Sequence, residues 1–149
     1  MNETIFKTAY ELAKQAAKAD EVPVGAVIFN TQTEEIIATA RNQSEELNSP
    51  LAHAEILCIR NACQKLGMKR LTGYSLFVTL EPCTMCAGAI AWARLDHLYF
   101  GAYDPKTGAV NQGPQVFTRP QTHHKIQIEG GIHADMCGEL LTAFFMNKR

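Results

Sequence analysis

The sequence has no long apolar run and no excess of positive charge. No stretch approaches the ~20 apolar residues of a membrane-spanning helix, and the N-terminal residues are polar, unlike a secretory signal. The net charge is −1 and the isoelectric point is near 6.5, whereas proteins that bind nucleic acids are usually basic. These absences predict a cytoplasmic protein without membrane association, in which any contact with nucleic acid depends on a local basic patch.

Cysteine is scarce and odd in number. The five cysteines cannot all pair, and without a secretory segment a reducing compartment is the natural location. The apolar content is 46%, and 149 residues suffice for one sizeable core. We therefore expect residues 1–149 to form a single domain.

Two short stretches, residues 53–55 and 82–86, carry the side chains best suited to chemistry. His53, Cys83 and Cys86 offer the nitrogen and sulfur atoms that zinc prefers, and three such ligands leave a fourth tetrahedral position to water. Zinc lowers the pKa of that water from ~15.7 towards ~7. Glu55 is a carboxylate that can take the water proton and return it to a leaving amine. The set predicts a catalytic Zn²⁺ and hydrolytic deamination, with Glu55 as the catalytic residue.

Each stretch has other interpretations when taken alone. Cys-x-x-Cys in a cytosolic chain is as typical of a redox pair, and His-x-Glu usually marks a solvated helix start. A purely structural zinc would need a fourth Cys or His, and none stands at ligand spacing. The conjunction of the two stretches, each followed by a helical apolar pattern, favours the catalytic zinc of nucleobase deaminases.

The spacing of these residues also predicts where they lie on helices. Cys83 and Cys86 are three residues apart and share a helix face. His53 and Glu55 are two apart and converge only in a first turn, where side chains lean past the helix start. The partial positive charge of a helix N-terminus favours thiolates. Both stretches are therefore expected to open helices.

Apolar periodicity predicts alternating helices and strands. Helices are expected over residues 4–19, 53–66 and 87–93 and around 137–145, and strands over 24–29, 36–40, 74–80, 97–100 and 125–128. The first two strands read as an antiparallel hairpin. A helix separates strands 24–29 and 74–80, which indicates that part of the sheet is parallel. In the second helix we expect a buried stripe of Ile56, Ile59, Cys63 and Leu66. This order predicts an α/β fold with three layers, α/β/α, and a mixed five-stranded sheet.

With these motifs placed, the chain resembles the bacterial tRNA adenosine deaminases of the cytidine deaminase-like superfamily. The resemblance runs nearly end to end and rests on residues 21–26, 42, 53–55, 79–89, 100–102 and 104–108. It implies a cytidine deaminase-like fold and conversion of adenosine to inosine at the wobble position of a tRNA anticodon. It also implies a homodimer with one Zn²⁺ per subunit.

The same resemblance implies a set of substrate-binding residues. Asn42 would hydrogen-bond the flipped purine, and the backbone of Ala54 would read its edge. Contacts with the anticodon stem-loop would come from Glu21, Pro23, Val24, Asp104, Lys106, Phe145 and Arg149. The plain alternatives are a core position for Phe145 and solvated charges for Lys106 and Arg149. A basic patch for RNA could gather from the last third of the chain, which holds Lys106, Arg119, His123, His124, Lys125, Lys148 and Arg149.

Two other functions remain open on the sequence. A free guanine or cytosine deaminase would use the same zinc chemistry, and residues 89–94 also resemble the guanine deaminases. The turn at residues 104–108 favours the tRNA enzymes instead. A non-enzymatic RNA-binding subunit with a structural zinc conflicts with Glu55 standing unliganded beside the metal.

Overall fold

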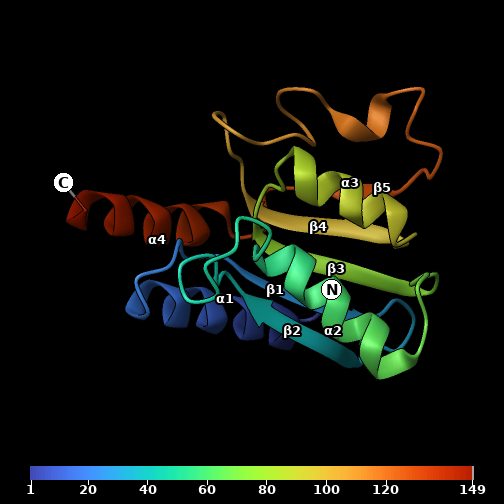
Figure 1. Cartoon of the computed structure of the whole chain (residues 1–149), viewed down its shortest axis with the longest axis horizontal. Coiled ribbons are helices and arrows are strands. Elements are labelled where there is room, and N and C mark those ends of the chain that lie inside the picture. The colour runs from blue at the N-terminus through green and yellow to red at the C-terminus, as the bar shows by residue number, and fades with distance from the viewer. Residues whose placement is uncertain (149) are drawn as a thin grey trace.

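The computed structural model, which describes residues 1–148, has a central sheet with helices on both faces (Figure 1). The elements in chain order are α1 (Glu3–Lys18), β1 (Gly25–Asn30), β2 (Ile36–Arg41), α2 (Ala54–Leu66), β3 (Tyr74–Leu80), α3 (Thr84–Trp92), β4 (His97–Ala102), the 3-10 helix η1 (Val116–Thr118), β5 (Gln127–Glu129) and α4 (Ala134–Asn147). Helices α2 and α3 share one face of the sheet, and α1 and α4 share the other. The prediction of an α/β/α fold is confirmed.

The sheet is mixed and five-stranded, as predicted, in the order β2-β1-β3-β4-β5. The hairpin of β1 and β2 is antiparallel, and β4 pairs in parallel with both β3 and β5. However, β1 and β3 pair antiparallel, so the parallel part does not lie where the sequence suggested. Helix α2 connects β2 to β3, and these two strands run in the same direction with β1 between them.

Strand residues alternate between two apolar clusters, one on each face of the sheet. Val27, Phe29 and Phe77 pack with Ile5 and Phe6 of α1. Their neighbours along the strands turn to the other face and pack with α2 and α3, forming a cluster that includes Ala26, Ile28, Leu76, Val78, Leu57, Cys58, Ala87 and Ile90. This alternation is the period-2 geometry of β-strands, and burial on both faces explains why these strands are apolar throughout.

The buried stripe of α2 differs from the expected one. Leu57, Cys58 and Ala62 are the apolar residues of the helix most deeply buried after Ala54, and the Cys58 thiol lies 3.4 Å from the carbonyl oxygen of Ala38. The residues expected in this stripe, Ile56, Ile59, Cys63 and Leu66, are only partly buried. Apolar residues cover more than one face of α2, so periodicity alone does not select the face that meets the sheet.

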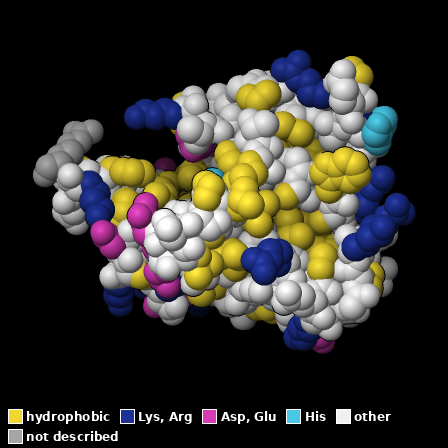
Figure 2. Space-filling model, viewed as in Figure 1, with side chains coloured by type: hydrophobic (Ala, Val, Ile, Leu, Met, Phe, Trp, Pro, Cys, Tyr) yellow, Lys and Arg dark blue, Asp and Glu magenta, His cyan; other side chains and the backbone are white. Residues whose placement is uncertain are grey.

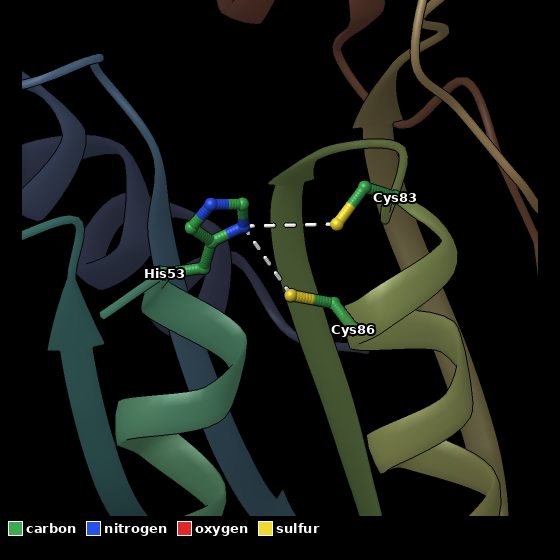
Figure 3. Close-up of side chains that lie close together, drawn as sticks. All are labelled: His53, Cys83 and Cys86. Atoms are coloured by element: carbon green, nitrogen blue, oxygen red, sulfur yellow. Dashed lines mark hydrogen bonds between the residues drawn. The ribbon is translucent and has the colours of Figure 1, made fainter. Parts of the chain in front are cut away.

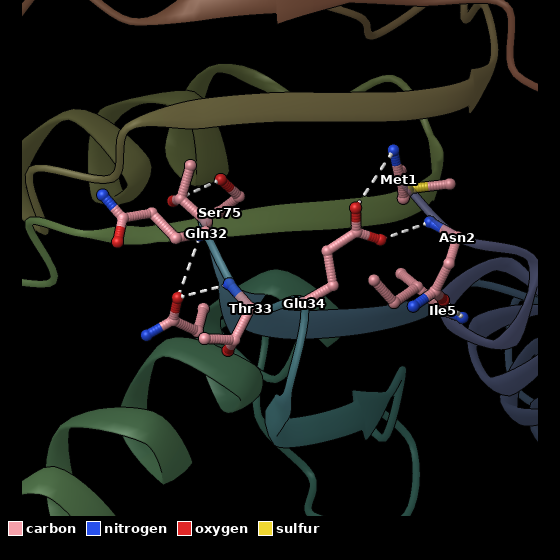
Figure 4. A network of polar contacts seen from close by, with 9 residues as sticks. Met1, Asn2, Ile5, Gln32, Thr33, Glu34 and Ser75 are labelled. Atoms are coloured by element: carbon pink, nitrogen blue, oxygen red, sulfur yellow. Dashed lines mark hydrogen bonds and ion pairs between the residues drawn. The ribbon is translucent and has the colours of Figure 1, made fainter.

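The start of α1 is tied to the turn between β1 and β2 (Figure 4). Asn2 Oδ1 accepts a hydrogen bond from the Ile5 N–H at 3.0 Å, which caps the helix. The Asn2 N–H in turn donates to Glu34 Oε1 at 2.6 Å. Asn30 Oδ1 closes the turn by accepting from the N–H groups of Gln32 and Thr33. The helix therefore begins at a fixed point on the hairpin.

Apolar side chains also gather on the outside of the molecule, on the face that carries α2 and α3 (Figure 2). Trp92, the last residue of α3, is 82% exposed, and Leu51 is 58% exposed. Within residues 1–148, none of the helices is long and apolar enough to span a membrane.

Candidate active site

Four strands bring the functional segments to one edge of the sheet. Gly25, which begins β1, lies opposite Arg41, which ends β2. Leu80 and Ala102 are paired residues at the ends of β3 and β4. Helices α2 and α3 both start beyond this edge, as the sequence predicts. Parallel strands commonly hold ligands at such an edge, beyond their carboxyl ends.

His53, Cys83 and Cys86 converge at this edge, the histidine from α2 and the cysteines from α3 (Figure 3). His53 Nδ1 lies 3.7 Å from Cys83 Sγ and 3.5 Å from Cys86 Sγ. A tetrahedral zinc ion with ordinary bond lengths would separate its nitrogen and sulfur ligands by about 3.6 Å. The three donors therefore fit a metal ion of this kind, with one coordination position left over.

The helix starts leave the side chains of His53 and Cys83 free of capping hydrogen bonds. His53 and Cys83 occupy the N-cap positions of α2 and α3, yet neither side chain caps its helix. The side chain of an N-cap residue normally accepts a hydrogen bond from a backbone N–H of the first turn. In α2 this acceptor is instead Asn42, whose Oδ1 accepts from the Ala54 N–H at 2.7 Å. Asn42 thus replaces His53 as the cap, and the imidazole can turn to the cysteines.

The two thiols share one proton. A hydrogen bond from Cys86 lowers the pKa of Cys83 to about 4, with a further contribution from His53. The same hydrogen bond, together with burial, raises the pKa of Cys86 far above its ordinary value. The hydrogen bond to Cys83 also raises the pKa of His53. Cys83 therefore loses its proton readily, whereas Cys86 and His53 hold theirs until a cation displaces them.

Glu55 lies in the first turn of α2 and is only 4% exposed. Burial raises the pKa of its carboxyl group to about 7, and the nearby Cys83 acts in the same direction. A carboxyl group that titrates near neutral pH can both accept and return a proton during one reaction. This is the property required of a proton carrier beside a metal-activated water.

A cleft of about 610 Å³ opens above the cluster, and Figure 2 shows this hollow beside α4 at the left of the view. Its floor includes His53, Glu55 and Cys83. The walls come from segments far apart in the chain and are made by Val22, Val24, Asn42, Ser44, Leu80, Glu81, Tyr103, Asp104, Pro105, Lys106, Thr107, Leu141, Thr142, Phe145 and Met146. A cleft of this size can hold a nucleotide-sized ligand.

The structure brings most of the implied substrate-binding residues to this cleft. Val24, Asn42, Asp104, Lys106 and Phe145 line it, and Phe145 is 49% exposed rather than a core residue.

Three others are buried and do not contribute to the described lining. Pro23 is buried, the Ala54 N–H is already bound to Asn42, and the Glu21 carboxylate accepts the N–H groups of Glu45 and Glu46. Arg149 lies outside the described residues.

The basic residues of the last third do not form one patch. Lys106 lies in the cleft, whereas His123 and His124 line a separate hollow beside Trp92. Lys148 contacts Asp20. Among the cleft residues that sequence reasoning missed, Tyr103 and Thr142 come from a loop and from the last helix. The one feature of the sequence that could have indicated Tyr103 is its position directly before the turn at residues 104–108, where an aromatic side chain can be exposed.

Known proteins resemble this chain along nearly all of its length. The family model described as MafB19-like deaminase matches residues 1–148. A tRNA-specific adenosine deaminase of Agrobacterium fabrum is 48% identical over 92% of this chain and 89% of its own.

Two solved structures share the fold. One, from a study of tRNA deaminases that perform A-to-I editing at the wobble position, is 45% identical, with a TM-score of 0.90 over 94% of this chain and all of its own. A guanine deaminase of Nitrosomonas europaea has a TM-score of 0.84 over 97% of this chain and 84% of its own. Its sequence identity is only 23%, so this second likeness concerns the fold alone.

Proposed function

The chain belongs to the tRNA-specific adenosine deaminases, and on that premise we propose that it deaminates the wobble adenosine of a tRNA anticodon. The reaction consumes water and adenosine and releases inosine and ammonia. The observation that carries the proposal is the floor of the cleft, where three metal-type donors lie within 4.8 Å of one another beside the buried Glu55.

We propose zinc as the metal, one ion per chain, held by His53, Cys83 and Cys86. The donor set and its spacing support zinc, because thiolate sulfur and imidazole nitrogen in a tetrahedral arrangement are its usual ligands. When bound there, zinc supplies Lewis acidity that lowers the pKa of a coordinated water from ~15.7 towards ~7.

Glu55 moves the protons of the reaction. Its carboxylate takes one proton from the attacking water and delivers it to the purine ring nitrogen, then takes the second from the new hydroxyl group and delivers it to the amine that departs as ammonia. Burial raises the pKa of this carboxyl group, which favours return of the proton once it has been accepted. Asn42 orients the base: its Oδ1 is fixed by the Ala54 N–H, which leaves the side-chain amide N–H groups to donate to the purine.

An anticodon loop is a suitable partner because an enzyme that acts on a base must take it out of the stack. The cleft is larger than a free base requires, and its walls carry groups for a flanking RNA strand. Lys106 can pair with a phosphate, and the exposed Phe145 offers a ring for stacking. We propose that Val24 and Asp104, which also line the cleft, contact the RNA strand. Glu21, Pro23 and Ala54 are buried, and we propose that they support the residues that line the cleft.

We further propose that residues 1–149 act as one deaminase domain in a cytoplasmic homodimer. The five free cysteines fit a reducing compartment. The apolar side chains over α2 and α3, with Trp92 largely exposed, offer a surface that a second subunit could cover.

The proposed function is tested with a synthetic anticodon stem-loop that carries adenosine at the wobble position. Inosine in this stem-loop supports the proposal if free guanine, cytosine and adenine stay unchanged. A matched stem-loop with adenosine only at a neighbouring position controls for non-specific editing. Turnover of free guanine or cytosine without inosine would instead make the chain a nucleobase deaminase, which shares the zinc chemistry and is the less supported alternative.

A further inference from the structure

Glu81 is a buried carboxylate that the proposed chemistry does not use. It stands between the end of β3 and the metal ligand Cys83, and its residue is 2% exposed. Burying a carboxylate is costly unless hydrogen bonds replace its hydration. Within residues 1–148, no lysine, arginine or histidine forms an ion pair with it. Its compensation must therefore come from other donors.

These donors are four backbone N–H groups, all from the segment of residues 104–112, here called the wall segment. Glu81 Oε1 accepts from the Asp104 N–H at 3.0 Å. Glu81 Oε2 accepts from the N–H groups of Val110, Asn111 and Gln112 at 3.1, 2.7 and 3.0 Å. Both oxygens accept and neither donates, which is the pattern of an ionised carboxylate. The wall segment thus wraps around a single charge.

Close backbone approach completes this arrangement. A Cβ atom on Gly108 would lie 2.7 Å from Glu81 Oε1 and 2.5 Å from the Asp104 carbonyl oxygen, so only glycine fits there. Next to the carboxylate, the Ala109 N–H donates to the Pro82 carbonyl at 2.9 Å, and Gly108 pairs with Cys83. The wall segment is therefore fastened to the same three residues that lead into the metal site.

Asp104 connects Glu81 to the wall of the substrate cleft. Once its N–H is held by Glu81, the Asp104 carboxylate accepts from the N–H groups of Lys106 and Thr107, each at 3.0 Å. The residues from Asp104 to Thr107 form one wall of the cleft above the metal donors. Glu81 also lines the cleft, although its side chain is almost fully buried. Through Asp104, Glu81 therefore determines the position of Lys106 relative to His53, Cys83 and Cys86.

We propose that Glu81 is a positioning residue that holds the wall segment in place and thereby sets the affinity for the RNA substrate. The effect on RNA affinity rests on the proposed function, whereas the hydrogen bonds between Glu81 and the wall segment do not depend on it. Four hydrogen bonds to one charge are lost together when the charge is removed. The wall should then move as a unit while the metal donors, which belong to α2 and α3, stay in place.

The test uses the metal-loaded protein and compares Glu81→Gln with the control Glu35→Gln, which removes the same charge from an exposed turn. A glutamine amide can offer one oxygen, and its NH₂ group opposes the remaining N–H donors. We expect hydrogen exchange at the amides of Asp104, Val110, Asn111 and Gln112 to become about 10- to 100-fold faster, because a hydrogen bond to a charged group is lost. We expect metal content to stay at the wild-type value. KM for the stem-loop should rise about tenfold with kcat nearly unchanged, as for lost ground-state binding.

Gly108→Ala provides a second, independent variant that keeps the carboxylate and displaces the wall segment from the other side. It should reproduce the faster exchange and the higher KM, and it carries the test if Glu81→Gln does not fold. Unchanged exchange at the four amides in either folded variant would overturn the proposal. So would loss of the metal with the wall intact, or a fall in kcat at constant KM. If the wild-type protein leaves the stem-loop unedited, the proposed function fails, whereas the exchange data still decide whether Glu81 holds the wall.

Discussion

Cys83 and Cys86 differ in acidity although both are thiols at the same site. The hydrogen bond between them stabilises the Cys83 thiolate and keeps the proton on Cys86. Cys83 also stands at the N-terminus of α3, where the helix dipole favours negative charge. Because the thiolate is the reactive form of cysteine, the five cysteines of this chain should differ strongly in reactivity once the metal is removed.

We predict that iodoacetamide modifies Cys83 alone in metal-stripped protein at pH 6. A pKa lowered to about 4 means that Cys83 is already a thiolate above that pH, so its rate should change little between pH 5 and 8. Burial raises the pKa of Cys137 to about 11 and that of Cys58 further, so both stay protonated over this range. Peptide mass mapping gives the modified site.

Added zinc provides the control, because a ligand that is bound to metal is protected. Modification of Cys58 or Cys137 under these conditions, or a rate that climbs steeply above pH 8, would contradict the assigned acidities.

The residue types of the candidate metal site could be predicted from the sequence, because zinc chemistry demands particular atoms at particular spacings. His53, Glu55, Cys83 and Cys86 could be singled out because the two stretches that satisfy those demands occur together in one sequence. The role of Glu81 could not, because its partners are backbone N–H groups up to 31 residues away that only the fold brings together. Glu21 is similar: a charged residue in a matching motif gave no sign that it would be buried against a turn.

Helix α1 lies close against the start of β1. Gly25 begins β1, and its N–H donates to Thr79 Oγ1 of β3 at 3.1 Å. A Cβ atom at this position would collide with the Ala9 carbonyl oxygen and meet the Ala13 nitrogen at 3.0 Å. Both contacts are with the backbone of α1, which cannot turn aside as a side chain can. The absence of a side chain at Gly25 therefore fixes the separation of helix and strand.

We predict that Gly25→Ala lowers the free energy of unfolding by about 3 kcal/mol, the upper range for overpacking a close-packed core. Urea denaturation of metal-loaded protein measures the change. Gly138→Ala is the matched control: it lies inside α4 with nothing within 4 Å of the added atom. It should raise stability by up to ~1 kcal/mol, because alanine is the better helix former. An unfolding midpoint of Gly25→Ala equal to that of wild type would refute this packing.

The types and order of the elements and the antiparallel pairing of the first two strands could be predicted from apolar periodicity, but the order of the strands across the rest of the sheet could not. Helix α2 suggested a parallel neighbour for the hairpin, yet β1 lies between β2 and β3 and reverses the local direction. Strand order depends on packing between residues far apart in the sequence, and local apolar periodicity carries no information about such packing. For the same reason α2 buries Leu57, Cys58 and Ala62 instead of the stripe that spacing favoured.

The whole molecule carries a net charge of −1, so electrostatic attraction to RNA must be local. Lys106 is the one lysine or arginine in the described lining of the cleft. Each cation that neutralises a phosphate of single-stranded RNA adds about 0.7 to the steepness of the salt dependence. Binding should therefore weaken with salt, but with a shallow slope.

We predict that Lys106→Ala weakens stem-loop binding and lowers the magnitude of the log K against log salt slope by about 0.7. Fluorescence anisotropy at several salt concentrations measures both quantities. Lys69→Ala is the control, because this exposed lysine lies between α2 and β3, at the opposite edge of the sheet from the cleft. An unchanged slope for Lys106→Ala would show that this lysine is only a solvated charge.

We propose above that Glu55 and a metal ion held by His53, Cys83 and Cys86 deaminate an RNA adenosine with water. The most direct test runs the stem-loop reaction in water enriched in oxygen-18 and analyses the product nucleosides by mass spectrometry. We predict inosine that carries one oxygen-18 atom from wild-type protein, and none from Glu55→Gln even though this variant keeps its metal. Inosine from Glu55→Gln at a rate near that of wild type, or inosine without the heavy oxygen, would contradict this mechanism.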